Sequence, residues 1–166
     1  MSPTYAASTS VGSDASRSEI ARTVTRYGAD QFAYMESVDR AMVAFVYQGR
    51  HVRLSLPLPD RHGAEFTAYE DRYGHPKRRT ESAAAQLYEQ AIRQRWRALA
   101  LVVKANLEAV EAGIFTFEEA FLGALVLPGG RSVYEEVMPA VAAAIESGGP
   151  LRLAIGPGTA DRGRAR

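Results

Sequence analysis

The chain has 166 residues, of which 46% are hydrophobic and 23% charged, and these proportions exclude collagen-like, mucin-like and fully disordered proteins. Lys and Arg number 20 against 19 Asp and Glu, so the net charge of +1 lacks the basic excess of a dedicated duplex-DNA binder. Cysteine is absent, which excludes a disulfide framework, a thiolate nucleophile and Cys-ligated zinc.

The N-terminal segment 1–13 is rich in Ser, Thr, Ala and Gly and has no apolar periodicity, so we expect a flexible arm. It has neither the charged start nor the apolar stretch of a secretory signal. Ser16 and Glu19 have the spacing of a capping box. The apolar residues after them recur at helical intervals and predict a helix over about 17–27, ended by Gly28: Ile20, Val24 and Tyr27.

Three short segments with strand character follow, at 31–36, 40–47 and 51–56. The third alternates regularly, with apolar residues on one face and His51, Arg53 and Ser55 on the other. A tight turn at Gly49-Arg50 would join the second and third segments. The pattern predicts a three-stranded antiparallel meander, which Pro57 and Pro59 end.

Residues 58–80 have the composition of a long polar loop, and loops of this length are usually functional or disordered. Thr80 or Ser82 can then cap a helix over 81–112, which Gly113 would end. At 1.5 Å per residue this helix is about 45–50 Å long. Apolar residues cover most of its circumference, so we expect it at the centre of the fold with little solvent exposure.

Two further capping boxes mark the C-terminal part. Thr116 and Glu119 open a short helix to about residue 125, and Ser132 and Glu135 open a helix over 133–146. Glycines and a proline then predict a disordered tail over 148–166. The expected fold is α+β, with a three-stranded antiparallel meander packed on a long central helix, a helical C-terminal part and a single domain over 14–147.

Basic residues gather in two places. Three arginines surround Trp96 on the long helix, and a second cluster lies in the loop that precedes it. If the loop folds back along the helix, the two clusters form one basic groove that would contact phosphates, with exposed aromatics stacking on bases. The alternative is a set of solvated charges offset by neighbouring carboxylates. The candidate nucleic-acid-binding residues are Arg72, Tyr73, Lys77, Arg78, Arg79, Arg93, Arg95, Arg97 and Lys104.

Arg95 and Asn106 interrupt the apolar arc of the long helix, and Tyr88 lies on the same side. A buried arginine needs a partner. A salt bridge would satisfy Arg95. It could also bury its aliphatic carbons while its guanidinium reaches water. The other hypothesis is a phosphate or substrate contact in a cleft.

The sequence has no phosphate-binding loop, dinucleotide-binding motif or nucleophile elbow. The segment that contains Asp60, His62, Asp71 and His75 could supply nitrogen and oxygen ligands for a metal-dependent nuclease, but its spacing matches no known metal motif. We therefore expect no enzymatic activity, no metal and no cofactor.

Three stretches resemble a family of small proteins from actinobacterial and other tailed phages and prophages: LPLPDR at 56–61, QRWRALALVVKANLEAVE at 94–111 and TFEEAFL at 116–122. The resemblance covers about residues 14–147. It implies a place in a phage gene set and the cytoplasm of the host cell, and it carries over no catalytic residue. The order helix, meander and long helix is also similar to the core of phage single-strand annealing proteins, which bind single-stranded DNA and assemble into rings or filaments.

These observations predict a phage accessory protein that binds single-stranded DNA in replication, recombination or DNA protection. The alternative is a phage module that inhibits or redirects a host or phage protein. Its first anchors would be Phe115, Phe117 and Phe121, and their simpler role is core packing. Further copies of the chain are a third kind of partner, and no membrane association is expected.

Overall fold

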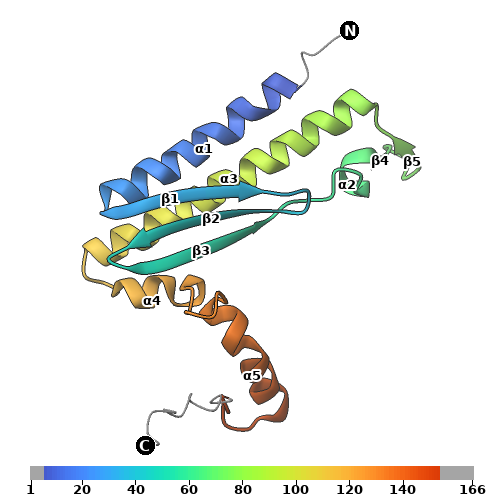
Figure 1. Cartoon of the computed structure of the whole chain (residues 1–166). Coiled ribbons are helices and arrows are strands. Elements are labelled where there is room, and N and C mark those ends of the chain that lie inside the picture. Colours follow the sequence, from blue (N-terminus) through green and yellow to red (C-terminus); the bar gives the residue numbers. More distant parts are fainter. Residues whose placement is uncertain (1–5, 154–166) are drawn as a thin grey trace, which may run out of the picture.

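The computed structural model describes residues 6–153, and it has the predicted α+β architecture (Figure 1). The predicted disordered tail lies largely outside the described residues, as do residues 1–5. The elements in chain order are α1 (Ala6–Arg26), β1 (Ala29–Glu36), β2 (Arg40–Tyr47), β3 (Arg50–Pro57), α2 (Ala64–Thr67), β4 (Ala68–Glu70), β5 (Pro76–Arg78), α3 (Glu81–Glu111), α4 (Phe117–Phe121), the 3-10 helix η1 (Leu122–Ala124) and α5 (Val133–Ser147).

The sheet is the predicted antiparallel meander, with strand order β1-β2-β3. Side chains of β2 alternate between its two faces, and Ala41, Val43 and Phe45 are buried under the helices. The turn between β2 and β3 is one residue earlier than predicted. It uses Gln48 and Gly49, whose positive φ angles of 47° and 76° suit a two-residue hairpin.

Helices α1 and α3 lie side by side and pack against the buried face of the sheet (Figure 1). The Thr80 hydroxyl accepts a hydrogen bond from the Ala83 amide at 3.3 Å, so α3 begins where the sequence predicts. Trp96 is fully buried at the centre of this layer. The other large, fully buried side chains belong to the same core: Ile20, Val24, Val43, Val52, Val103 and Leu107.

Helix α1 begins at Ala6, so the prediction of a helix over only 17–27 after a flexible arm is wrong for residues 6–16. Ser16 and Glu19 lie inside the helix and do not cap it. The apolar periodicity used for the prediction reports packing, so a helical segment without that periodicity, such as 6–16, leaves no signal in the sequence.

The polar segment 58–80 is also more ordered than predicted, because it contains α2 and the hairpin of β4 and β5. Phe66 of α2 is buried and packs edge-on against Tyr88 of α3, with ring centroids 5.6 Å apart. Strands of three residues are too short to show an alternating pattern, so the sequence gives no signal for this hairpin.

The expectation that α3 has little solvent exposure is wrong for one of its sides. Leu101 is 57% exposed and Val102 is 52% exposed. The sheet and α1 cover only part of the circumference of α3, and no described element buries this side. A helix that is apolar all round is normally buried, so this side lacks a partner within the described chain.

Both C-terminal capping boxes form as predicted, at Thr116 with Glu119 and at Ser132 with Glu135. The backbone amide of Thr116 donates to the Glu119 carboxylate and holds the pKa of Glu119 below its usual range.

Two of the predicted partner anchors, Phe117 and Phe121, are buried in the core, and Phe115 is 49% exposed. Phe117 and Phe121 therefore serve in core packing. Both rings pack edge-on against Phe45, and the Phe117 ring also stacks on Tyr47.

Candidate nucleic-acid interface

The hairpin of β4 and β5 is closed by one carboxylate. The backbone amides of Tyr73 and His75 donate to Asp71 Oδ1 at 2.9 and 3.0 Å. The hydrogen bond from His75, followed by that from Tyr73, holds the pKa of Asp71 below its usual range. Lys77 Nζ lies 3.3 Å from Asp71 Oδ2. Asp71 thus orders the turn and partly neutralises Lys77, one of the predicted phosphate contacts.

Two tyrosines on this hairpin are exposed, Tyr69 by 42% and Tyr73 by 67%. The Arg72 guanidinium lies 4.6 Å from the ring centroid of Tyr73 and also donates to its hydroxyl. The Arg79 guanidinium lies 5.4 Å from the ring of Tyr69. Each exposed ring therefore has a cation beside it, an arrangement suited to stacking bases and contacting phosphates together.

Arg79 also has a structural role. Its guanidinium donates to the carbonyl oxygen of Ala68, and to that of Glu65 at 3.3 Å. These bonds hold the hairpin against α2. Arg79 is therefore a fixed positive charge at the base of the hairpin, and only part of its donor capacity faces outward.

A cavity of about 440 Å³ lies between the hairpin, the segment before α2 and the first turns of α3. We call it the hairpin cavity, and it is lined by Arg61, His62, Thr67, Arg78, Arg79, Glu81, Ala84 and Ala85. The Arg78 guanidinium makes no hydrogen bond or ion pair with any described residue. Three of the lining residues are arginines and one is a glutamate, and the positive end of the α3 dipole adds to the field, so the cavity favours an anionic group.

The second basic cluster lies along the groove between α1 and α3. Arg93 and Arg97 line a depression against the middle of α1, and Lys104 lines the next one. Arg93 is 3.9 Å from Glu89, and Lys104 is 3.7 Å from Glu108. Arg97 has no ion pair among the residues from 14 to 153 whose side chains are described. Two arginines of α1 that sequence reasoning missed join this cluster, Arg22 and Arg26.

The two clusters do not form the single groove that the sequence predicted. At 100° per residue, Arg97 is rotated by about 160° from Glu81, which lines the hairpin cavity. The two residues are also about 24 Å apart along the helix axis. The loop closes into a hairpin over the first turns of α3 and does not fold back along the helix, so the clusters face different sides.

The polar residues in the apolar arc of α3 have partners within the fold. Arg95 donates to the Pro57 carbonyl oxygen at 2.7 Å, where β3 ends. Asn106 Nδ2 donates to the Ala120 carbonyl oxygen at 3.0 Å, at the end of α4. Arg95 therefore serves the fold, and its predicted role in phosphate contact has no support from its position.

The hypothetical metal site does not assemble. Asp60 accepts a hydrogen bond from the His62 amide, and Asp71 is occupied by the hairpin turn. Within the described part of the chain, no group of three or more His, Asp or Glu side chains could hold a metal ion.

Among the basic residues of the cavity, Arg61 and His62 are the two that sequence reasoning did not select as binding residues. Arg61 lies 5.7 Å from the ring of Tyr88 on α3, and this contact brings it to the cavity. No local pattern around Arg61 announces a contact with a residue 27 positions later, so only the tertiary packing identifies it.

No protein-family model, curated protein or solved structure matches the chain. The resemblance to phage proteins therefore stays a prediction from the sequence. In the stretch that the structure describes, no helix is both long and apolar enough to cross a membrane.

Proposed function

We propose that this protein binds single-stranded nucleic acid through the hairpin cavity and the two exposed tyrosines beside it. The observation that carries this proposal is the unpaired Arg78 guanidinium, which lines the cavity together with Arg61 and His62. A phosphate oxygen is the anionic group that arginine forks bind best.

Single strands fit this arrangement better than duplexes. The bases of a single strand are free to stack on Tyr69 and Tyr73, whereas those of a duplex are already stacked. Duplex binders neutralise many phosphates over an extended basic surface, and the chain has a net charge of only +1. The resemblance to phage proteins suggests the setting, which is replication, recombination or DNA protection in an infected cell.

The test is a fluorescence anisotropy titration with labelled single-stranded and double-stranded oligonucleotides at low and moderate salt. Phosphate-driven binding to a single strand should weaken with a log–log salt slope of about −0.7 per phosphate contacted. Arg78→Glu should lower the affinity about tenfold or more. Tyr73→Ala should lower it about fivefold to tenfold, the low end of one lost base stack.

Arg40→Glu is the control for charge, because Arg40 is an exposed arginine at the start of β2 and the substitution changes the net charge equally. It should leave the affinity unchanged. Arg97→Glu reports separately on the cluster beside α1. Absence of binding at low salt, or an equal loss in the Arg40 and Arg78 variants, would contradict the proposal.

A protein-binding role is the second candidate, because α5 is an apolar helix without a single buried residue. This role predicts association with one protein that persists at high salt. Competition with an oligonucleotide would leave such association unchanged.

A further inference from the structure

Helix α5 (Val133–Ser147) projects away from the rest of the fold (Figure 1). None of its residues is buried, although residues 137–145 carry no charged side chain. Ile145 is 75% exposed and Tyr134 is 60% exposed. A helix of this length is marginal in water on its own, because most helices gain their stability from packing an apolar face.

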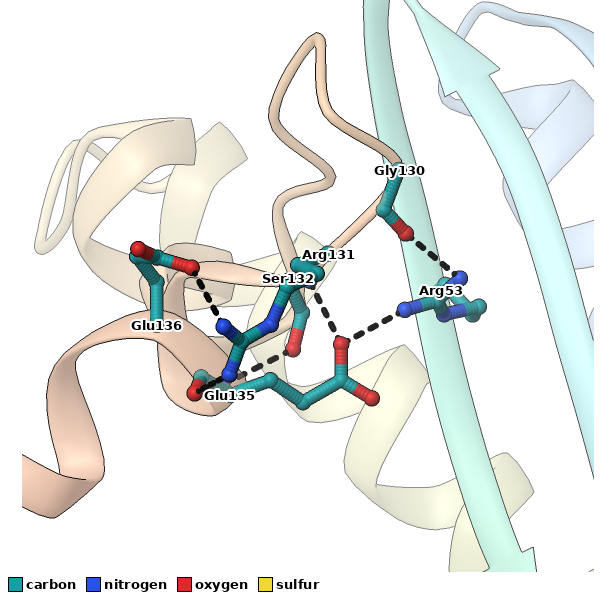
Figure 2. Close-up of polar contacts among 6 residues, drawn as sticks. All are labelled: Arg53, Gly130, Arg131, Ser132, Glu135 and Glu136. Carbon is teal, nitrogen blue, oxygen red and sulfur yellow. Dashed lines mark hydrogen bonds and ion pairs between the residues drawn. The ribbon is translucent and has the colours of Figure 1, made fainter. Parts of the chain in front are cut away.

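The first turn of α5 is held firmly, as Figure 2 shows. Arg53 of β3 donates to Glu135 at 2.7 Å and to the Gly130 carbonyl oxygen at 3.0 Å. The Ser132 amide donates to the Glu135 carboxylate at 2.7 Å, and this bond holds the pKa of Glu135 below its usual range. The start of the helix is therefore fixed to the edge of the sheet.

Pro139 lies inside α5 and has no amide hydrogen to donate to the Glu135 carbonyl four residues before it. The Arg131 guanidinium donates to that carbonyl instead, and it also forms an ion pair with Glu136 at 3.0 Å. The proline is thus accommodated, and α5 continues as a helix. Beyond these first turns, no described side chain of α5 has a polar contact with another element.

The exposed side of α3 is the second apolar surface without a partner. We call it the outer face of α3, and its exposed residues include Gln94, Ala98, Leu101, Val102 and Ala105. Ala91 and Ala109 on this face are half-buried, and Leu101 lies where the face meets the depression beside α1. Ala91, Ala98 and Ala105 are seven residues apart, or about two helical turns. Such a row of small side chains forms a shallow groove that larger side chains of another helix can enter.

The charges of the two surfaces are complementary. Helix α5 carries three carboxylates and no Lys or Arg. Glu135 and Glu136 pair with Arg53 and Arg131 at its start, which leaves Glu146 near its C-terminal end. The outer face of α3 is bordered on one side by Arg97, which has no ion pair among the residues whose side chains are described. Pairing α5 with another α5 would add like charges, whereas the border of the outer face offers a guanidinium without a partner.

We propose that two copies of this chain form a dimer in which α5 of each copy packs on the outer face of α3 of the other. The exchange is reciprocal, so both unpartnered surfaces are covered at once and the assembly closes with two-fold symmetry. The proposal does not depend on nucleic-acid binding.

The experiment measures the molar mass of the full chain in solution, by light scattering after size exclusion, over a range of protein concentrations. The unmodified protein should be a dimer. Ile145→Glu places a charge on α5 and Leu101→Glu places a charge on the outer face of α3, so each variant alone should be monomeric. Circular dichroism confirms that both variants fold. Val38→Glu is the control, since Val38 is 93% exposed in the β1–β2 turn and should leave the dimer intact.

Mixing the two monomeric variants gives the sharpest result. The Ile145→Glu copy keeps an intact outer face of α3, and the Leu101→Glu copy keeps an intact α5. In the mixture the intact α5 can pack on the intact outer face, so a dimer with one of the two contacts should form. An interface between two α3 helices would not be restored by mixing. A monomeric unmodified protein, a dimer in either variant alone, or a mixture that stays monomeric at the highest concentration would each overturn the proposal.

Discussion

Helices α3 and α5 are both rich in apolar residues, yet they differ in what those residues contact. Seven residues of α3 are buried, six of them in the core shared with the sheet and α1, and none of α5 is buried. The buried residues of α3 recur every three or four positions, as in Ile92, Trp96, Leu99 and Val103. Residues 137–145 of α5 form an unbroken uncharged run instead. Hydrophobicity alone therefore does not locate a core; the core lies where the apolar period matches a neighbouring surface.

The largest expected effect separates these two helices directly. Trp96→Ala should lower the free energy of unfolding by about 3–5 kcal/mol, because it leaves a large cavity in the core. Ile145→Ala should change it by less than about 0.5 kcal/mol in dilute protein, where this side chain is exposed. Urea denaturation of both variants at low concentration measures the contrast. Equal losses would mean that α5 packs within its own chain.

A smaller effect should appear at the start of α5. Arg131→Ala removes the donor to the Glu135 carbonyl and should weaken the helix by about 1 kcal/mol. In a Pro139→Ala background the new backbone amide at position 139 supplies that hydrogen bond, so Arg131→Ala should cost less. The double-mutant cycle compares the helical circular dichroism of the unmodified protein, the two single variants and the double variant. An equal cost of Arg131→Ala in both backgrounds would contradict the role assigned to the guanidinium.

Much of the fold could be predicted because its signals are local. The Thr116 and Ser132 capping boxes each depend on residues three positions apart, and both form. The alternation in β2 and β3 reports one buried face and gives the meander. The start of α1 could not be placed, because residues 6–16 carry no apolar period.

The site was less predictable, because its residues meet only through tertiary contacts. Arg61 reaches the hairpin cavity by packing on Tyr88, and the hairpin turns Arg78 to a different side from Arg97. Arg17, a half-buried residue of α1, is a similar case outside the site. Its guanidinium lies 5.0 Å from the ring of Tyr34 and 5.3 Å from that of Trp96, and nothing in the sequence around it indicates this position.

The central claim is that the exposed side of α5 beyond its anchored start has no partner in its own chain and finds one in a second copy. Amide hydrogen exchange, followed separately for α3 and α5 at several protein concentrations, tests it most directly. We expect α3 to stay protected throughout, and α5 to be protected at high concentration and to lose protection on dilution or in the Leu101→Glu variant. Protection of α5 that is independent of concentration and unchanged in that variant would contradict the claim.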